Sequence, residues 1–357
     1  MFRTGVTKQA RFFHSHPSST AFSLSLDACL REGRGVGCLP ARRQGARVEI
    51  SIVSPSPPFP PAEGGEDFWK SEVQLDRLRE RIQQIKKKRP GYGKILDFYQ
   101  SVKEAQEKAK TSLKIDSIPL RKEWKTLLSK EGFSLIRKED FPLDIESSVK
   151  LFETLCQVGR DANPYMADQV RKIEETIGRD RTNLRKLFEG GWKEEKIEKV
   201  ADEWVLDRRV FLFLLQSSIR PSVEAGVDQL RSELNPETWL KEYCPLCGSP
   251  PSLSLLKEEV GKRYLLCSFC GYQWRTDRIL CPFCKNKDQE SLRYFYGEGE
   301  KTHLIDLCDR CHQYIKTIDA RNLKESDPVL EDLGTLHLDL LASREGYKRP
   351  APAPWTI

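Results

Sequence analysis

The chain has 357 residues, of which 38 % are hydrophobic and 31 % are charged, and its formal net charge is +6 at pH 7. This length favours two or three domains, and the composition is that of a soluble globular protein with a well-charged surface. The mild positive charge hints at acidic partners without arguing for nucleic acid, and the longest strongly apolar run, from Val210 to Leu215, is far too short to span a membrane.

Residues 1–65 differ from the rest of the chain. They are rich in Ser, Pro, Gly and Arg, with Asp27 as the first acidic residue. The proline-rich stretch at 54–65 cannot form a helix or a central strand. An Arg-rich start with few acidic residues is typical of an organelle transit peptide, but we favour a disordered leader or an over-extended start of translation.

Residues 66–237 are predicted to form a helical domain. Apolar residues recur every three or four positions from Leu75 to Ile85, from Met166 to Ile177 and from Val223 to Leu234, and each run ends at a glycine or a proline. The segment 197–219 is apolar on more than one face, which predicts a central buried helix. Six or seven helices fit this region. It carries no glycine-rich phosphate loop and no nucleophile elbow, so we interpret it as a scaffold or docking domain.

The C-terminal third of the chain carries most of the cysteines. Eight of the eleven form Cys-x-x-Cys pairs at Cys244/Cys247, Cys267/Cys270, Cys281/Cys284 and Cys308/Cys311. Two such pairs supply the tetrahedral four-thiolate shell that zinc or rubredoxin-type iron requires. Regular pairs in a chain of this length indicate metal ligands in a reducing compartment rather than a disulfide framework. The sequence therefore predicts two metal sites, while Cys156 lies on an apolar helical pattern and is expected in the core.

The gaps between the pairs indicate which pairs share a metal. Nineteen residues separate the first two pairs, ten separate the middle two and twenty-three separate the last two. The long gaps have the length of the hairpin in a zinc ribbon or rubredoxin, and the short gap resembles a connector. Site one is therefore predicted from Cys244, Cys247, Cys267 and Cys270 in a module at 238–278, and site two from Cys281, Cys284, Cys308 and Cys311 in a module at 279–320. Interleaved pairing, first with third and second with fourth, is the alternative.

The residues that follow the second cysteine of each pair distinguish the two sites. Gly248 and Gly271 follow in site one, where glycine permits a positive φ and lets backbone N–H groups turn toward sulfur. Lys285 and His312 occupy these positions in site two. We therefore expect the turns of site two to be more strained or more open, and its metal to be lost first.

Charged and aromatic residues lie close to site one in the sequence. A four-thiolate site carries a net negative charge with either metal, which nearby cations could offset, and aromatic residues could shield it from water. An equally weighted alternative is that the cations are ordinary surface residues and the aromatic residues only pack in the core. The cations are Lys262, Arg263, Arg275 and Arg278, and the aromatic residues are Tyr272 and Trp274.

The last pair permits a second interpretation. The run from Cys308 to His312 fits the Cys-x-x-Cys-His pattern of covalent haem attachment. That chemistry requires export, for which we find no signal, and the pair is the fourth of a regular series. We therefore favour the metal site and leave His312 outside its shell.

The fold class follows from these segments. Short β-like stretches such as Arg263–Leu266 and Leu292–Tyr296 alternate with the cysteine pairs, and residues 321–357 are predicted as a C-terminal helix and tail, with one amphipathic helix from Pro328 to Tyr347. We predict a mainly α N-terminal domain, two small rubredoxin-like or zinc-ribbon-like four-cysteine modules, and a C-terminal helix.

Five stretches of this region form a recognisable signature. They are Cys244-Pro-Leu-Cys-Gly-Ser-Pro250, Leu266-Cys-Ser-Phe-Cys270, Cys281-Pro-Phe-Cys284, Cys308-Asp-Arg-Cys-His-Gln-Tyr-Ile-Lys-Thr-Ile-Asp319 and the segment from Asp327 to Leu341. With them the chain resembles the FdhE family of formate dehydrogenase accessory proteins. The resemblance is specific over about residues 240–348, is weaker over the helical region, and does not cover residues 1–65. Lys285 departs from the glycine expected at its position.

The resemblance implies a cytoplasmic accessory protein, not an enzyme, that serves the assembly or activation of formate dehydrogenase and contacts its catalytic subunit. It implies rubredoxin-like modules associated with iron, whereas four cysteines alone favour zinc. We expect two metal ions, with iron favoured and zinc the alternative. We expect no nucleic acid and no stable membrane insertion, and a homodimer is compatible with the sequence.

Two other functions stay open. A zinc-ribbon nucleic-acid binder would need a basic stripe, whereas Lys and Arg are mixed here with Asp and Glu. A rubredoxin-like electron carrier or thiol oxidoreductase could cycle through iron or through the cysteine pairs, although no thioredoxin-like context surrounds them.

Overall fold

The computed structural model describes residues 51–52, 71–119, 131–178, 181–189, 192–323 and 327–351. Of the predicted leader, these ranges include only Ser51–Ile52, which form the short strand β1. The rest of that segment lies outside the described residues. The leader and the domain boundaries stay predictions.

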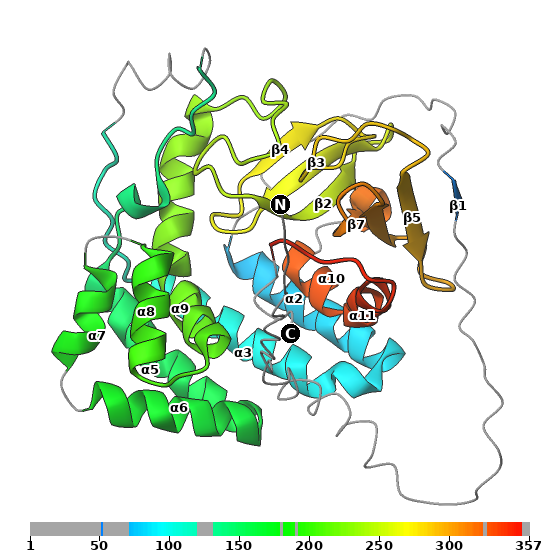
Figure 1. Cartoon of the computed structure of the whole chain (residues 1–357). Coiled ribbons are helices and arrows are strands. Elements are labelled where there is room, and N and C mark those ends of the chain that lie inside the picture. The colour runs from blue at the N-terminus through cyan, green and yellow to red at the C-terminus, as the bar shows by residue number, and fades with distance from the viewer. Residues whose placement is uncertain are drawn as a thin grey trace, which may run out of the picture. The chain divides into compact units, whose positions relative to one another are not determined.

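Helices fill the N-terminal half of the described chain (Figure 1). They are α2 (Ser71–Lys88), α3 (Gly93–Lys110), α5 (Ile145–Ala162), α6 (Pro164–Ile177), α7 (Arg181–Phe188), α8 (Glu194–Glu203) and α9 (Arg208–Leu230). Local signals explain their ends. Asn163 accepts a hydrogen bond from the Met166 N–H at the start of α6, and Gly178 ends that helix with a φ of 67°. The predicted helical runs at 75–85 and 166–177 are thereby confirmed.

The predicted helix at 197–219 is wrong at both ends. The segment is broken after α8, where Val205 adopts a φ of 54° and the Leu206 N–H donates to the Ala201 carbonyl. Beyond the break, α9 runs on through Pro221 instead of stopping before it. Proline cannot donate to the Ser217 carbonyl four residues back, and the buried Gln106 amide donates to that oxygen at 2.8 Å instead. The separate helix expected at 223–234 is therefore the last part of α9.

The strands of both cysteine modules form one sheet. It contains β1 and β2 (Pro251–Lys257), β3 (Lys262–Cys267), β4 (Gln273–Thr276), β5 (Leu292–Tyr296), β6 (His303–Cys308) and β7 (Gln313–Asp319), in the order β1-β5-β6-β7-β2-β3-β4. Neighbours are antiparallel except β2 and β7, which pair in parallel from Leu253 opposite Lys316 to Leu256 opposite Asp319. The two hairpins predicted as separate modules therefore share backbone hydrogen bonds.

The predicted single C-terminal helix is in fact two, α10 (Pro328–Leu333) and α11 (Leu336–Arg344). Gly334 and Thr335 interrupt it. The fully buried Lys316 ammonium donates to the Asp332 carbonyl at 2.9 Å and to the Thr335 carbonyl at 3.2 Å, so carbonyls at the break keep hydrogen-bond partners. A local helical pattern cannot reveal this donor, because it comes from strand β7.

The cysteine region contributes to three hydrophobic clusters, one of which packs Leu253 and Leu266 of the first module against Ile318 of the second. Leu246, Phe269 and Trp274 of the first module belong to the large core that contains the helices, as does Cys156, whose predicted burial is confirmed. The second hairpin packs instead against α11, with Phe295 and Ile305 against Leu338. The first module is thus built into the helical domain, while the second depends on the C-terminal helices.

Candidate metal centres

The eight paired cysteines form two groups of four. Cys244, Cys247, Cys267 and Cys270 make site one, and Cys281, Cys284, Cys308 and Cys311 make site two, with all sulfurs of a group within 4.8 Å of one another. This is the arrangement that the gap lengths predict, and the interleaved alternative is wrong. All eight are free thiols.

The sulfur spacing suits a tetrahedral ion. In site one, Sγ of Cys247 lies 3.4 Å from Sγ of Cys267 and 3.6 Å from that of Cys270. In site two, the Cys281–Cys311 and Cys284–Cys308 sulfur distances are 3.7 Å and 3.6 Å. Four sulfurs bound tetrahedrally at about 2.3 Å would lie roughly 3.8 Å apart. Each group could therefore hold one metal ion with little rearrangement.

One turn geometry recurs at the cysteine pairs. The N–H of the residue after the second cysteine donates to the carbonyl of the first cysteine in three of them, at 2.9 Å for Gly248, 3.0 Å for Lys285 and 2.9 Å for His312. That residue has a positive φ in all four turns: 75° at Gly248 and Gly271, 62° at Lys285 and 52° at His312. The conformation that glycine permits in site one is thus imposed on two larger residues in site two.

The two groups differ in burial. All four cysteines of site one are buried, whereas Cys284 and Cys311 of site two are partly exposed. Solvent and dissolved reagents reach buried sulfurs poorly, so the sulfurs of site two are the more accessible.

The third cysteine of each group, Cys267 or Cys308, has a lowered pKa. Burial acts to raise the pKa of Cys267, but hydrogen bonds from the other three thiols and from the Cys270 N–H outweigh it and leave the pKa well below its usual value. At Cys308 burial is likewise outweighed, here by N–H groups of its own turn and by the Asn286 amide 3.6 Å from the sulfur. Burial raises the pKa of Cys244 well above its usual value and that of Cys281 to about 11. Metal binding must therefore release the protons of the thiols whose pKa is raised.

The four cations expected near site one have other partners. Arg263 donates to Asp306 at 2.9 Å, and Arg275 to Glu237 at 3.0 Å. Lys262 lies 2.9 Å from Glu258, and Arg278 donates to the Val260 carbonyl. Three of these cations are therefore ion-paired with carboxylates, and Arg278 bonds to an uncharged carbonyl.

Arg220 on α9 is the cation at site one that our sequence reasoning missed. Its Nη1 donates at 3.0 Å to the carbonyl of Phe269, which lies between Cys267 and Cys270. The signal in the sequence is weak, because about fifty residues separate this arginine from the turn. Tyr272 and Trp274 are buried as core residues, and burial raises the pKa of Tyr272, with a further contribution from Cys244 and Cys270.

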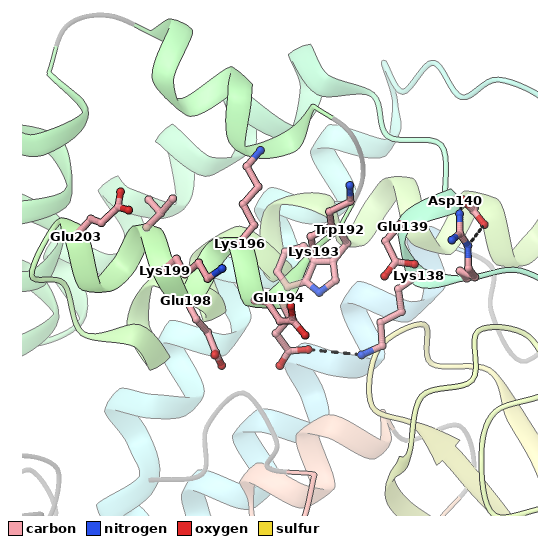
Figure 2. A pocket seen from close by; sticks show the side chains of 13 residues that line it. Lys138, Glu139, Asp140, Trp192, Lys193, Glu194, Lys196, Glu198, Lys199 and Glu203 are labelled. Atoms are coloured by element: carbon pink, nitrogen blue, oxygen red, sulfur yellow. Dashed lines mark hydrogen bonds and ion pairs between the residues drawn. The ribbon is translucent and has the colours of Figure 1, made fainter.

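Phe269 also links site one to a hollow in the helical domain. Its ring centroid lies 5.8 Å from that of Phe141 and 6.0 Å from that of Trp192. Trp192 lines a hollow of about 960 Å³ between the 137–140 segment and α8, which Figure 2 shows. The lining is otherwise mostly charged, with Lys138 paired to Glu194 at 3.5 Å. Trp192 thus contacts both the hollow and the turn that presents two site-one cysteines.

Comparison with known proteins gives two matching family models. "FdhE, central domain" matches residues 243–278, and "FdhE, C-terminal domain" matches residues 279–355. Together they contain all eight paired cysteines.

Sequence similarity to known proteins extends beyond these two domains. A Protein FdhE homolog of Aquifex aeolicus (strain VF5) is 27 % identical over 291 residues, which span 78 % of this chain and 96 % of that protein. A homolog from Stutzerimonas stutzeri (strain A1501) is 34 % identical over 113 residues, and Protein FdhE of Escherichia coli O127:H6 is 31 % identical over 118. These last two alignments span 36 % and 38 % of the relatives' own lengths.

A solved structure shares the fold. The crystal structure of the FdhE protein from Pseudomonas aeruginosa superposes with a TM-score of 0.56 at 21 % identity, covering 79 % of this chain and 95 % of that one. The predicted order of helical domain, four-cysteine sheet region and C-terminal helices is thereby confirmed.

Proposed function

Because this chain belongs to the FdhE family, we propose that it is an accessory protein required for the assembly or activation of a formate dehydrogenase. Family membership itself supports an association with formate dehydrogenase. We assign the protein no catalytic turnover of its own and place it in the cytoplasm. Across the described residues, no helix has both the length and the apolar character needed to cross a bilayer.

The two sulfur groups support metal binding as part of this function. We propose that the eight cysteines hold two metal ions, with iron favoured from the family resemblance and zinc the alternative. Elemental analysis of protein purified without air distinguishes them. About two iron atoms per chain is the expected result, two zinc atoms would reverse the preference, and a metal-free folded protein would refute the assignment.

The proposed role is tested in a strain that lacks this protein. We expect formate oxidation to be lost on deletion and restored by the wild-type chain and by Cys156→Ala. We expect no restoration by Cys244→Ser/Cys247→Ser, because this variant breaks site one, whereas Cys156 only packs in the helical core. Normal formate oxidation in the deletion strain would refute the role.

We propose further that the client contacts the chain through its helical and metal-binding domains. The hollow lined by Trp192 supports this, because Trp192 packs on Phe269 of the first module and the other lining residues are mostly charged side chains that a protein partner could pair. Lys193→Glu/Lys199→Glu should weaken co-purification with the catalytic subunit. The matched control is Lys150→Glu, an exposed lysine of α5 outside the hollow. Equal recovery with both variants would exclude the hollow as the contact.

A redox role is the second candidate. The partial exposure of Cys284 and Cys311 favours it, because electron or thiol exchange requires access to sulfur. A reversible change in visible absorption on reduction of the iron-loaded protein would support electron transfer, and an unchanged spectrum would exclude electron transfer by the iron.

A further inference from the structure

Arg220 is held against the second cysteine turn of site one. Besides the Nη1 bond to the Phe269 carbonyl, its Nη2 approaches Gly271 so closely that a Cβ at position 271 would lie 2.5 Å from it. A side chain at 271 is therefore disfavoured for two reasons, the φ of 75° and the guanidinium packed over it. The guanidinium thus covers the backbone that presents Cys267 and Cys270.

A carboxylate on the same helix fixes the orientation of this guanidinium. Arg220 Nε donates to Glu224 Oε1 at 2.6 Å, and Lys110 of α3 lies 2.8 Å from the other oxygen of Glu224. Three groups from two helices therefore form a fixed network with Arg220 at the end nearest the sulfurs. Such preorganisation lowers the entropy cost of holding a long side chain at one place.

Positive charge close to site one would offset the negative charge of its four thiolates. Four thiolates around a divalent ion carry two net negative charges, and all four cysteines of site one are buried, where solvent screens charge poorly. The cations near site one in the sequence are paired elsewhere.

We propose that Arg220 is a positioning residue for the metal at site one, which it stabilises by offsetting the thiolate charge and by holding the turn from Cys267 to Gly271. This inference depends on metal occupancy as proposed above, but not on the identity of the client. Partners of this kind, which orient ligands from outside the coordination shell, typically change metal affinity by about 10–100-fold.

The test uses the full chain loaded with Zn²⁺ alone and titrated with a chelator. Pulse alkylation followed by peptide mass spectrometry reports which cysteines lose protection. Arg220→Gln should release the site-one metal at a free zinc concentration about 10–100-fold higher than wild type requires. Site two, in the same molecule, should be unchanged. Arg275→Gln is the matched control, because Arg275 lies five residues from Cys270 in sequence yet pairs with Glu237.

A second variant separates the lost cation from the carboxylate left behind. Arg220→Gln/Glu224→Gln removes both charges, and the proposal predicts that site-one affinity stays low. Recovery of wild-type affinity in this double variant would overturn the proposal, since the defect would then come from unpaired Glu224. Equal affinity of Arg220→Gln and Arg275→Gln would also overturn it. Wild-type protein that binds no zinc would instead refute the metal assignment, and normal formate oxidation on deletion would refute only the accessory role.

Discussion

Lys285 and His312 share one backbone conformation, each directly after the second cysteine of a site-two pair, with φ values of 62° and 52°. Glycine occupies the equivalent positions in site one. A side chain in this left-handed region costs on the order of 1 kcal/mol, so site two carries strain in both of its turns.

The first prediction concerns this strain. Lys285→Gly should raise the thermal midpoint of the metal-loaded second hairpin by relieving about 1 kcal/mol, less a small loss from the exposed ion pair with Glu242. Lys287→Gly is the control, because Lys287 is also exposed and ion-paired but does not have a positive φ. A lower midpoint for Lys285→Gly than for Lys287→Gly would show that the turn is not strained.

The second prediction concerns the order of metal loss. Site two should empty before site one during stepwise chelation, because Cys284 and Cys311 are partly exposed and the site-one cysteines are buried. Native mass spectrometry should show a one-metal species in which Cys281 and Cys308 are alkylated and Cys244 is protected. Alkylation of Cys244 at that stage would contradict this order.

The third prediction concerns full removal of metal. The strands should lose protection from hydrogen exchange, since each hairpin is closed at a sulfur group and structural metal sites of this type contribute on the order of 10–16 kcal/mol to folding. Amides of α5 and α6 should stay protected, because neither helix carries a site cysteine and Phe152 of α5 packs edge-on against Phe211 of α9. If the strands stay protected without metal, the sheet is stable on its own and the metal ions do not contribute to its folding.

Comparison of the sequence-based expectations with the structure separates the features that local sequence predicts from those that it does not. The strands at 263–266 and 292–296 and the grouping of the sulfurs depend on local patterns and spacings, and they agree with the structure. The parallel pairing of β2 with β7 and the contact of Arg220 with Phe269 join residues about fifty or more positions apart. No local pattern encodes such contacts, since they depend on how separate elements pack together.

The fourth prediction concerns the buried ion cluster under α10 and α11. Lys316 lies 2.7 Å from Asp332 and 2.5 Å from Asp339, and the Arg349 guanidinium completes the cluster. Lys316→Met should cost about 3–5 kcal/mol at pH 7, because it leaves buried carboxylates incompletely paired. Lys301→Met, at an exposed site, should change the free energy of unfolding by less than about 0.5 kcal/mol.

The difference in the free energy of unfolding between wild type and Lys316→Met should depend on pH, and the sign of this dependence follows from Asp332. Burial acts to raise the pKa of Asp332, but Arg349 and Lys316 outweigh it and hold the pKa below its usual value near 3.8. The carboxylate therefore contributes stability above about pH 4, and this contribution is lost as the pH falls through its folded-state pKa. The gap between wild type and Lys316→Met should shrink in acid. A gap that grows below pH 4 would contradict the assigned charges.

The fifth prediction tests how α9 passes through Pro221. Gln106→Leu should cost about 1–3 kcal/mol, because it removes the donor to the Ser217 carbonyl, which Pro221 cannot replace. In a Pro221→Ala background the new N–H can donate to that carbonyl, so the same substitution should cost less. Denaturant unfolding of both single variants and the double variant gives the coupling energy. Gln100→Leu on the same helix is the control, since the Gln100 amide donates to the Glu104 side chain on the helix surface and not to a backbone carbonyl of α9. Additive costs for Gln106→Leu and Pro221→Ala would show that this carbonyl is satisfied in another way.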